Sequence, residues 1–349
     1  RSLAVIATGE PTFRETLLPG AILVRTAASH IRVGTFQYAS QYAANQNEPD
    51  VLKALADYTI QRHFPNILEK TDETTRYPAF IKAVMNRQAS LIAKWQHVGF
   101  IHGVMNTDNM AICGETIDYG PCAFMDRYDP QTVFSSIDHQ GRYAYQNQPS
   151  IAQWNLARFI ETMLPLLNSK REDAVTQAQD ILNHFPKQLH HEWLSGMKAK
   201  LGLFTDEDDD TQLIQQLLVW MFHNEADFTN TFRTLCLDDS PEITRFARKH
   251  DQKSQFMDWY TLWLHRLRRQ PQSLVDIQNT MLANNPAVIP RNHQVEAALT
   301  AACQDNNYQP LHELLAVLKT PYADLASHQQ HYSEPAPDDS PPYQTFCGT

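Results

Sequence analysis

The stretch that decides the fold is His102-Gly-Val-Met-Asn-Thr-Asp-Asn109, which continues through an apolar segment to Asp118-Tyr-Gly120. The segment between them is apolar on both sides of Gly114-Glu115, a turn-forming pair. This pattern predicts a tight β-hairpin that places Asn109 at its entrance and Asp118 at its exit. A carboxamide oxygen beside a carboxylate supplies hard oxygen ligands, which suit Mg²⁺.

The same stretch is similar to two protein-kinase motifs, the catalytic loop H-R-D-x-x-x-x-N and the metal-binding D-F-G. His102 stands at the start of the loop, Asn109 stands at the Asn position, and Asp118-Tyr-Gly takes the place of D-F-G. The usual catalytic Asp would fall at Val104, so an ordinary kinase base is missing. Asp108 is the only carboxylate in the loop that can substitute. A polar loop followed by a structural hairpin would give a similar short pattern.

Longer runs of residues carry a resemblance to one family, in which they occur in the same order. These runs are Gly9-Glu-Pro11, Arg14-Glu15, Leu18-Pro-Gly20, Ser29-His-Ile-Arg-Val-Gly-Thr-Phe36, residues 102–110, residues 116–121, Asp138-His-Gln-Gly-Arg-Tyr143 and Asn147-Gln-Pro149. On these runs nearly the whole chain resembles the selenoprotein O family. The resemblance implies a protein-kinase-like fold and protein adenylyltransferase activity. ATP would lie reversed relative to ordinary kinases, and AMP would pass to a Ser, Thr or Tyr hydroxyl of a protein.

The resemblance also implies roles for individual residues. Asp108 would accept the hydroxyl proton, and Asn109 and Asp118 would hold Mg²⁺, or Mn²⁺ in its place, against the ATP. Arg25 and Arg32 would contact the nucleotide phosphates, a role that suits the forked guanidinium group. The alternative for an arginine near an apolar strand is a structural salt bridge.

Two other functions remain open. A phosphotransferase acting on a hydroxyl would use the same nucleotide and metal site. A non-catalytic pseudokinase scaffold is suggested by Val104 in place of the usual base. His139 is a second candidate for a general base or ligand, although a hydrogen-bonded structural role is favoured because the sequence shows no partner acid.

The family carries a selenocysteine or cysteine at the third position from the end, and Cys347 matches it. Some members pair this residue with a cysteine downstream of the D-Y-G motif. Residues 132–135 contain no cysteine, which puts that redox link in doubt and leaves Cys122 as the nearest substitute.

Composition restricts the partners and the compartment. The net charge of −10 and the pI near 5.8 argue against binding nucleic acid through bulk charge. No window approaches eighteen apolar residues, so no membrane span is expected. The five cysteines are scattered without a C-x-x-C pair, which favours a reducing cytoplasm over a disulfide framework. With the family resemblance, we expect this to be the cytoplasm of a bacterium. We expect a monomer that acts on proteins, with no nucleic-acid or membrane partner.

A kinase-type site also uses a Gly-rich loop over the phosphates and a Lys–Glu pair. Neither is visible in the few residues before Arg25. In the family these features lie in a long N-terminal region. The chain is therefore expected to be a fragment lacking most of its N-lobe, with ATP binding that is weak or absent.

The fold class expected is α+β and predominantly α-helical: a protein-kinase-like C-lobe with short β-hairpins and a helical C-terminal extension. Strands are expected at residues 21–26 and 31–36, and residues 3–8 favour a strand or the end of a buried helix. A helix is expected around Val51–Phe64. A long amphipathic helix should follow, with Pro78 near its start and Gly99 at its end, and feed directly into the loop at His102. Further helices are predicted from Gln148 and over Glu172–Phe185, Gln188–Lys200, Thr211–Asn224, Asp227–Leu237, Phe256–Arg268, Ser273–Asn284, Asn292–Asp305 and Leu311–Leu318.

These elements predict three parts: a kinase-like catalytic core over residues 1–165, a helical region over 166–327, and an extended or mobile tail over 328–349 that ends near Cys347. The acidic run at residues 206–210 lacks the glycine and the closing Glu of a calcium loop, so a solvated helix N-terminus is favoured there.

Overall fold

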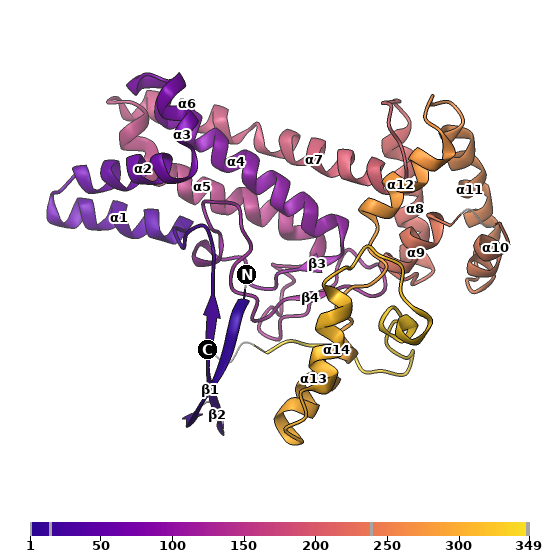
Figure 1. Ribbon diagram of the computed structural model, residues 1–349. Coiled ribbons are helices and arrows are strands. Elements are labelled where there is room, and N and C mark those ends of the chain that lie inside the picture. The colour runs from indigo at the N-terminus through magenta and orange to yellow at the C-terminus, as the bar shows by residue number, and fades with distance from the viewer. Residues whose placement is uncertain (1, 14–15, 238–239, 347–349) are drawn as a thin grey trace.

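A computed structural model describes residues 2–13, 16–237 and 240–346. The chain begins with an antiparallel two-stranded sheet of β1 (Ser2–Phe13) and β2 (Leu17–Arg25). This sheet projects away from the helices (Figure 1), and its apolar side chains are exposed. The strand predicted at residues 21–26 is confirmed. At residues 3–8 the strand is correct and the buried helix end is wrong. Arg14-Glu15 lies outside the described residues.

Three helices follow the sheet: α1 (Val33–Gln46), α2 (Asp50–His63) and α3 (Pro65–Lys70). The strand predicted at residues 31–36 is wrong, because the backbone winds into α1 from Val33 onward. The Thr35 hydroxyl accepts the Arg32 N–H at 3.1 Å, which satisfies a backbone donor where the helix begins. The helix predicted around Val51–Phe64 is confirmed as α2.

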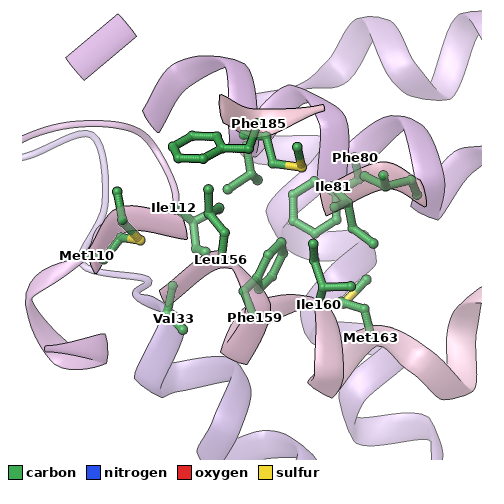
Figure 2. Close-up of a cluster of buried hydrophobic side chains, with 14 of the residues drawn as sticks. Val33, Phe80, Ile81, Met110, Ile112, Leu156, Phe159, Ile160, Met163 and Phe185 are labelled. Atoms are coloured by element: carbon green, nitrogen blue, oxygen red, sulfur yellow. The ribbon is translucent and has the colours of Figure 1, made fainter. Parts of the chain in front are cut away.

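The long helix α4 (Glu73–His97) packs against α5 (Gln148–Leu167), α6 (Arg171–Leu182) and α7 (Phe185–Lys200), as Figure 1 shows. Their shared core is apolar and includes Phe80 of α4 and Phe159 of α5 (Figure 2). Phe36 of α1 and Phe80 both lie edge-on to Phe159. Such edge-to-face pairs add to the free energy of burying the rings. This core makes α4 and α5 a rigid support for the segment between them.

The start of α4 differs from expectation and its end does not. Asp72 caps the helix by accepting the Thr75 N–H at 2.9 Å, so Pro78 lies inside the helix rather than in its first turn. Gly99 has a φ of +69°, the left-handed conformation that glycine adopts readily after a helix end. The chain therefore turns directly from α4 into the predicted catalytic loop.

The rest of the chain is helical, and the helices predicted there are confirmed to within a few residues. α1, α3 and α10 were not predicted. The remaining helices are α8 (Asp210–His223), α9 (Phe228–Leu235), α10 (Ser240–Arg248), α11 (Lys253–Leu267), α12 (Leu274–Asn284), α13 (Asn292–Gln304) and α14 (Gln309–Leu318).

The acidic run lies at the start of α8, and its exposed residues Asp206, Asp208 and Asp209 agree with the solvated helix N-terminus predicted there. Asp210 is the exception. Its side chain is only 2% exposed and accepts a hydrogen bond from Arg266 Nε at 2.6 Å. Lys198 lies 3.3 Å from the same carboxylate. A buried carboxylate needs such partners because its charge has lost its water.

Three clusters of buried apolar residues form the cores of the described chain: one between Val33 and Leu189, one between Ile101 and Met281, and a small one between Val288 and Tyr332. The predicted boundary after residue 165 falls in the last turn of α5. The three-part division of the chain stays a prediction. Among the described helices, none combines the length and the hydropathy that crossing a membrane requires.

The tail includes a short 3₁₀-helix, η3 (Ser327–Tyr332), and then an extended segment docked on the molecule. Thr345 N–H donates to Phe134 O at 2.8 Å, and Ser136 N–H donates to Thr345 O at 2.9 Å. The Thr345 hydroxyl also donates to Pro121 O at 2.8 Å. The described end of the tail pairs with the segment that follows Asp118-Tyr-Gly, and the extended form expected for residues 328–349 stays a prediction. Cys347 lies outside the described residues.

We predict that His97 makes stability depend on pH. Its Nε2–H donates to Trp193 O at 2.9 Å between α4 and α7, and burial lowers its pKa from 6.5 to about 4. The unfolded chain then binds the extra proton between these values, so this part of the stability is complete above pH 6.5 and is lost as pH falls toward 4. From pH 7 to pH 5, urea titrations should show the wild type losing about 2 kcal/mol more unfolding free energy than His97→Gln. Equal losses would contradict the prediction.

Candidate active site

The candidate site lies on the chain between two short paired strands, β3 (Phe100–Ile101) and β4 (Ala123–Phe124). The side chain of Gln148, in the first turn of α5, is fully buried. Its Oε1 accepts the His102 N–H and its Nε2 donates to Phe100 O, both at 3.0 Å. Because one amide serves a donor and an acceptor on either side of Ile101, it fixes the point where β3 becomes the loop.

A second amide of α5 holds the middle of the loop. Asn155 is fully buried, and its Nδ2 donates to Met105 O at 2.9 Å. Gln148 and Asn155 lie 46 and 50 residues from their partners along the chain. Sequence reasoning missed both of them, because no local pattern links a helix to a loop at that separation.

The hairpin predicted between Asn109 and Asp118 is present, reduced to one antiparallel bridge between Met110 and Thr116. Gly114, with a φ of +75°, makes the turn and donates its N–H to Ala111 O at 3.0 Å. Because Met110 pairs with Thr116, the chain enters the hairpin before Met110 and exits after Thr116 at the open end, opposite the turn. The bridge therefore lies between Asn109 and Asp118 along the chain, and their joint role as metal ligands stays a prediction.

The hairpin stays short because its first side also pairs with the segment before α1. Val33 N–H donates to Met110 O at 3.0 Å, and Ile112 N–H donates to Ile31 O at 2.9 Å. Arg32 thereby forms a bridge with Ala111. This pairing ties the predicted phosphate-binding arginine to the catalytic loop.

His102 fixes the loop and does not face solvent. Its ring is fully buried, its Nε2–H donates to Ile117 O at 2.8 Å, and it lies 5.4 Å from the Trp95 ring centroid. Burial lowers the pKa of the imidazole, which favours its neutral form. A neutral His102 thus connects the start of the loop to the residue before Asp118.

The side chains of Asn109 and Asp118 are the two candidate ligands of a metal ion. The Asn109 Nδ2 donates to Val104 O at 2.9 Å, which leaves its Oδ1 as the atom able to bind a cation. Asp118 has a φ of +56°, a left-handed conformation that non-glycine residues adopt rarely and often at functional sites. Its side chain is 46% exposed, and Oδ1 lies 3.8 Å from Arg25 Nη1.

Arg25 and Arg32 reach the site from different elements. Arg25 ends β2 beside Asp118, and its long, half-exposed contact is compatible with release to another anion. Arg32 is the N-cap residue of α1, and its buried Nε–H has no hydrogen-bond acceptor among the described residues. A buried donor without an acceptor is unfavourable, so this group is suited to an anion.

Asp108 lies exposed on a 3₁₀ turn, η1 (Thr107–Asn109), against the first turn of α1. A Cβ placed on Gly34 would lie only 2.0 Å from Asp108 Oδ1 and 2.9 Å from its Cγ. The carboxylate therefore occupies space that only glycine leaves free. Its position at a helix N-terminus also favours a negative charge.

The donor set fits a magnesium ion that is shared with a nucleotide. Among the described residues, no group of three or more His, Cys, Asp or Glu side chains could hold a metal. Mg²⁺ is usually bound by one or two protein oxygens together with substrate phosphates and water. Asn109 and Asp118 can supply that number of oxygens.

The two remaining candidates from the sequence are His139 and Cys122, and the charges of Arg25 and Asp118 act on the Cys122 thiol. His139 is exposed, and the adjacent Asp138 uses its carboxylate to accept the Arg142 and Tyr143 N–H groups at 2.9 and 2.8 Å. Burial raises the pKa of Cys122 to about 11, so its thiol stays protonated at neutral pH.

A loop that presents a carboxamide, carboxylates and guanidinium groups together is typical of enzymes that transfer a group from a nucleotide. The family model described as protein adenylyltransferase SelO matches residues 1–319. Three curated relatives share the name protein nucleotidyltransferase YdiU. All 349 residues align at 56% identity with the protein of Brevibacillus brevis, 55% with that of Halalkalibacterium halodurans and 54% with that of Bacillus cereus. The chain spans 68%, 68% and 69% of their lengths.

These matches place the chain among the protein nucleotidyltransferases. More narrowly, the chain belongs to the protein adenylyltransferase SelO family, which confirms the resemblance seen in the sequence.

We predict that Gly34→Ala lowers activity by displacing Asp108. The added methyl group must move the carboxylate or the first turn of α1, and a misplacement of about 1 Å can cost about 100-fold in rate. Circular dichroism should show an intact fold, because alanine is a good helix former. In an Asp108→Asn background, the same change should have little further effect on kcat. A wild-type rate for the single variant would contradict the role of Gly34.

Proposed function

We propose that this chain transfers AMP from ATP to Ser, Thr or Tyr hydroxyls of proteins, from a kinase-like catalytic core over residues 1–165 in the bacterial cytoplasm. The observations that carry this proposal are the bridge of Met110 and Thr116, which lies between Asn109 and Asp118 along the chain, and the 3.8 Å contact of Asp118 Oδ1 with Arg25 Nη1. Membership of an adenylyltransferase family supports AMP as the transferred group.

The basic and amide groups would position the nucleotide. Arg25 and Arg32 would bind phosphate oxygens through their N–H groups, and this electrostatic stabilisation is the main work in such transfers. Asn109 and Asp118 would hold Mg²⁺, or Mn²⁺ in its place. When bound, the metal ion neutralises charge on the phosphates.

Asp108 would act as the general base. The oxygen of the acceptor hydroxyl forms a bond to the α-phosphorus of ATP, its proton passes to the Asp108 carboxylate, and the bond from the α-phosphorus to pyrophosphate breaks. Asp108 is the exposed carboxylate of the loop, and Val104 cannot accept a proton. Its exposure supports the proposal because a protein hydroxyl must reach it from outside.

A comparison of two labels separates this function from its alternatives. Transfer from α-labelled but not γ-labelled ATP to a protein is expected for an adenylyltransferase. A phosphotransferase gives the reverse, and a pseudokinase scaffold gives neither. The relative from Brevibacillus brevis is a suitable positive control, since it aligns with all of this chain.

We predict that Asp118→Asn abolishes the Mg²⁺-dependent part of ATP affinity. Asn tolerates the left-handed conformation that Asp118 adopts at φ +56°, so this change tests the charge with less backbone strain than Asp118→Ala. Calorimetric titration with and without Mg²⁺ measures the effect. Asp173→Asn, on the exposed start of α6, is the matched control and should leave affinity unchanged. Retention of metal-dependent affinity by a folded Asp118→Asn protein would exclude Asp118 as a ligand.

We predict that Asp108→Ala and Asp108→Asn both lower kcat by about 100- to 10,000-fold, the contribution typical of an aligned base. ATP affinity should be largely kept, because the loss falls on the chemical step. Single-turnover transfer at saturating ATP measures it. A rate near that of the wild type would mean that Asp108 is not the base, and His139 would be the next residue to change.

A further inference from the structure

Residues 26–31 connect the two arginines of the candidate site, and they form neither a helix nor a strand. Arg32, which follows them, is fixed by its bridge with Ala111. Arg25, which precedes them, ends β2 in a sheet that projects away from the helices (Figure 1). The place of Arg25 beside Asp118 therefore depends on how this short link is attached to the rest of the molecule.

One residue of the link, Ala28, is held on both sides of its backbone. Its N–H donates to Glu115 Oε2 at 2.9 Å, and its carbonyl oxygen accepts from Arg62 Nε and Nη2 at 3.1 and 2.6 Å. Two N–H groups of one guanidinium directed at one oxygen fix its direction as well as its distance. Three residues of chain span at most about 10 Å, so this attachment limits the range over which Arg25 can move.

The next residue of the link, Ser29, is attached to the end of α2. Its Oγ lies 2.7 Å from His63 Nε2, and both side chains are buried. Burial lowers the pKa of His63, which favours a neutral ring beside the hydroxyl. Arg87 of α4 donates to His63 O at 2.7 Å. The link is thus anchored to a part of α2 that α4 holds in turn.

Glu115 reaches the link from the turn of the hairpin in the candidate site. It follows Gly114, whose φ of +75° makes that turn. Arg87 donates from Nη1 to Cys113 O at 3.2 Å, so the turn is also held by α4. Glu115 therefore stands on a supported turn and connects the hairpin to the link that carries Arg25.

We propose that Glu115 is a positioning residue, which holds Arg25 in place for a nucleotide phosphate through its hydrogen bond to Ala28. Arg62 acts with it on the carbonyl side. The phosphate role of Arg25 rests on the proposed function, whereas the attachment of Ala28 is a feature of the fold itself. These contacts are exposed to solvent, so the loss of one of them moves Arg25 without unfolding the chain.

The test compares Glu115→Ala with Glu115→Gln. Both changes remove the negative charge, but glutamine keeps an oxygen that can accept the Ala28 N–H. Calorimetric titration should show Glu115→Ala weakening ATP binding by about three- to ten-fold, the effect of one hydrogen bond, with Glu115→Gln within about two-fold of the wild type. Arg62→Ala should weaken ATP binding by a similar factor, because it releases the same residue from the other side.

A second background decides whether Glu115 acts through Arg25. In an Arg25→Ala protein, Glu115→Ala should lower ATP affinity by less than about two-fold further, because the group that it positions is gone. An equal loss in the two backgrounds would overturn the proposal. So would a Glu115→Gln variant that binds ATP as weakly as Glu115→Ala does.

The matched control is Glu313→Ala on α14. This change also removes an exposed carboxylate that accepts one hydrogen bond, here from Gln309 Nε2 at 2.8 Å. It should keep the wild-type ATP affinity in both backgrounds, and thermal unfolding should show every variant folded. A loss of affinity equal to that of Glu115→Ala would overturn the positioning role, because any missing surface carboxylate would then have the same effect.

A transfer assay with α-labelled ATP separates this proposal from the proposed function. Coupling between Glu115 and Arg25 in ATP binding, without any labelling of protein, would retain the positioning role and overturn the adenylyltransferase. Efficient labelling with additive effects of the two changes would retain the adenylyltransferase and overturn the positioning role. A wild type that binds no ATP would overturn the phosphate role of Arg25 and this proposal with it.

Discussion

The site depends on one buried amide, the side chain of Gln148. Its two hydrogen bonds hold Phe100 and His102, the residues on either side of the point where β3 becomes the catalytic loop. Both backbone groups are away from solvent, and an unpaired group there would cost about 1–3 kcal/mol. Because Gln148 belongs to the first turn of α5, the loop takes its position from the helical core rather than from a sheet.

The helical core can serve this purpose because it is packed on all sides. Phe36 of α1 and Phe80 of α4 both lie edge-on to Phe159 of α5, and these contacts join the three helices into one body. Figure 2 shows Phe80 and Phe159. α1 then presents its first turn to Asp108, and α4 ends at the start of β3. Asp108 and Arg32 therefore stand on or against a helix end, whereas Arg25 ends strand β2. Such an arrangement places side chains more accurately than a free loop does.

The sequence predicted the parts of the site that depend on local spacing. The turn at Gly114 and the bridge between Met110 and Thr116 follow from hairpin chemistry, and the end of α4 follows from Gly99. The roles of Gln148, Asn155 and Gly34 could not be predicted, because each depends on a contact between distant segments. The strand expected at residues 31–36 failed for a related reason. Its first residues do pair with the hairpin, but from Val33 the backbone is better satisfied as a helix that caps on Thr35.

The pairing of Thr345 with the segment after Asp118-Tyr-Gly has a topological consequence. The hydrogen bond from Thr345 to Pro121 joins residues 224 positions apart, so it closes a loop that contains most of the helices. Closing a loop of that size costs conformational entropy. This cost stays small only while the enclosed helices are folded and hold the two ends of the loop near one another. Opening of α8 or α11, or a proteolytic cut between them, would lengthen the effective tether and release the strand from Phe134. Local opening of helices distant along the chain from Asp118-Tyr-Gly is in this way coupled to the order of the segment that follows it.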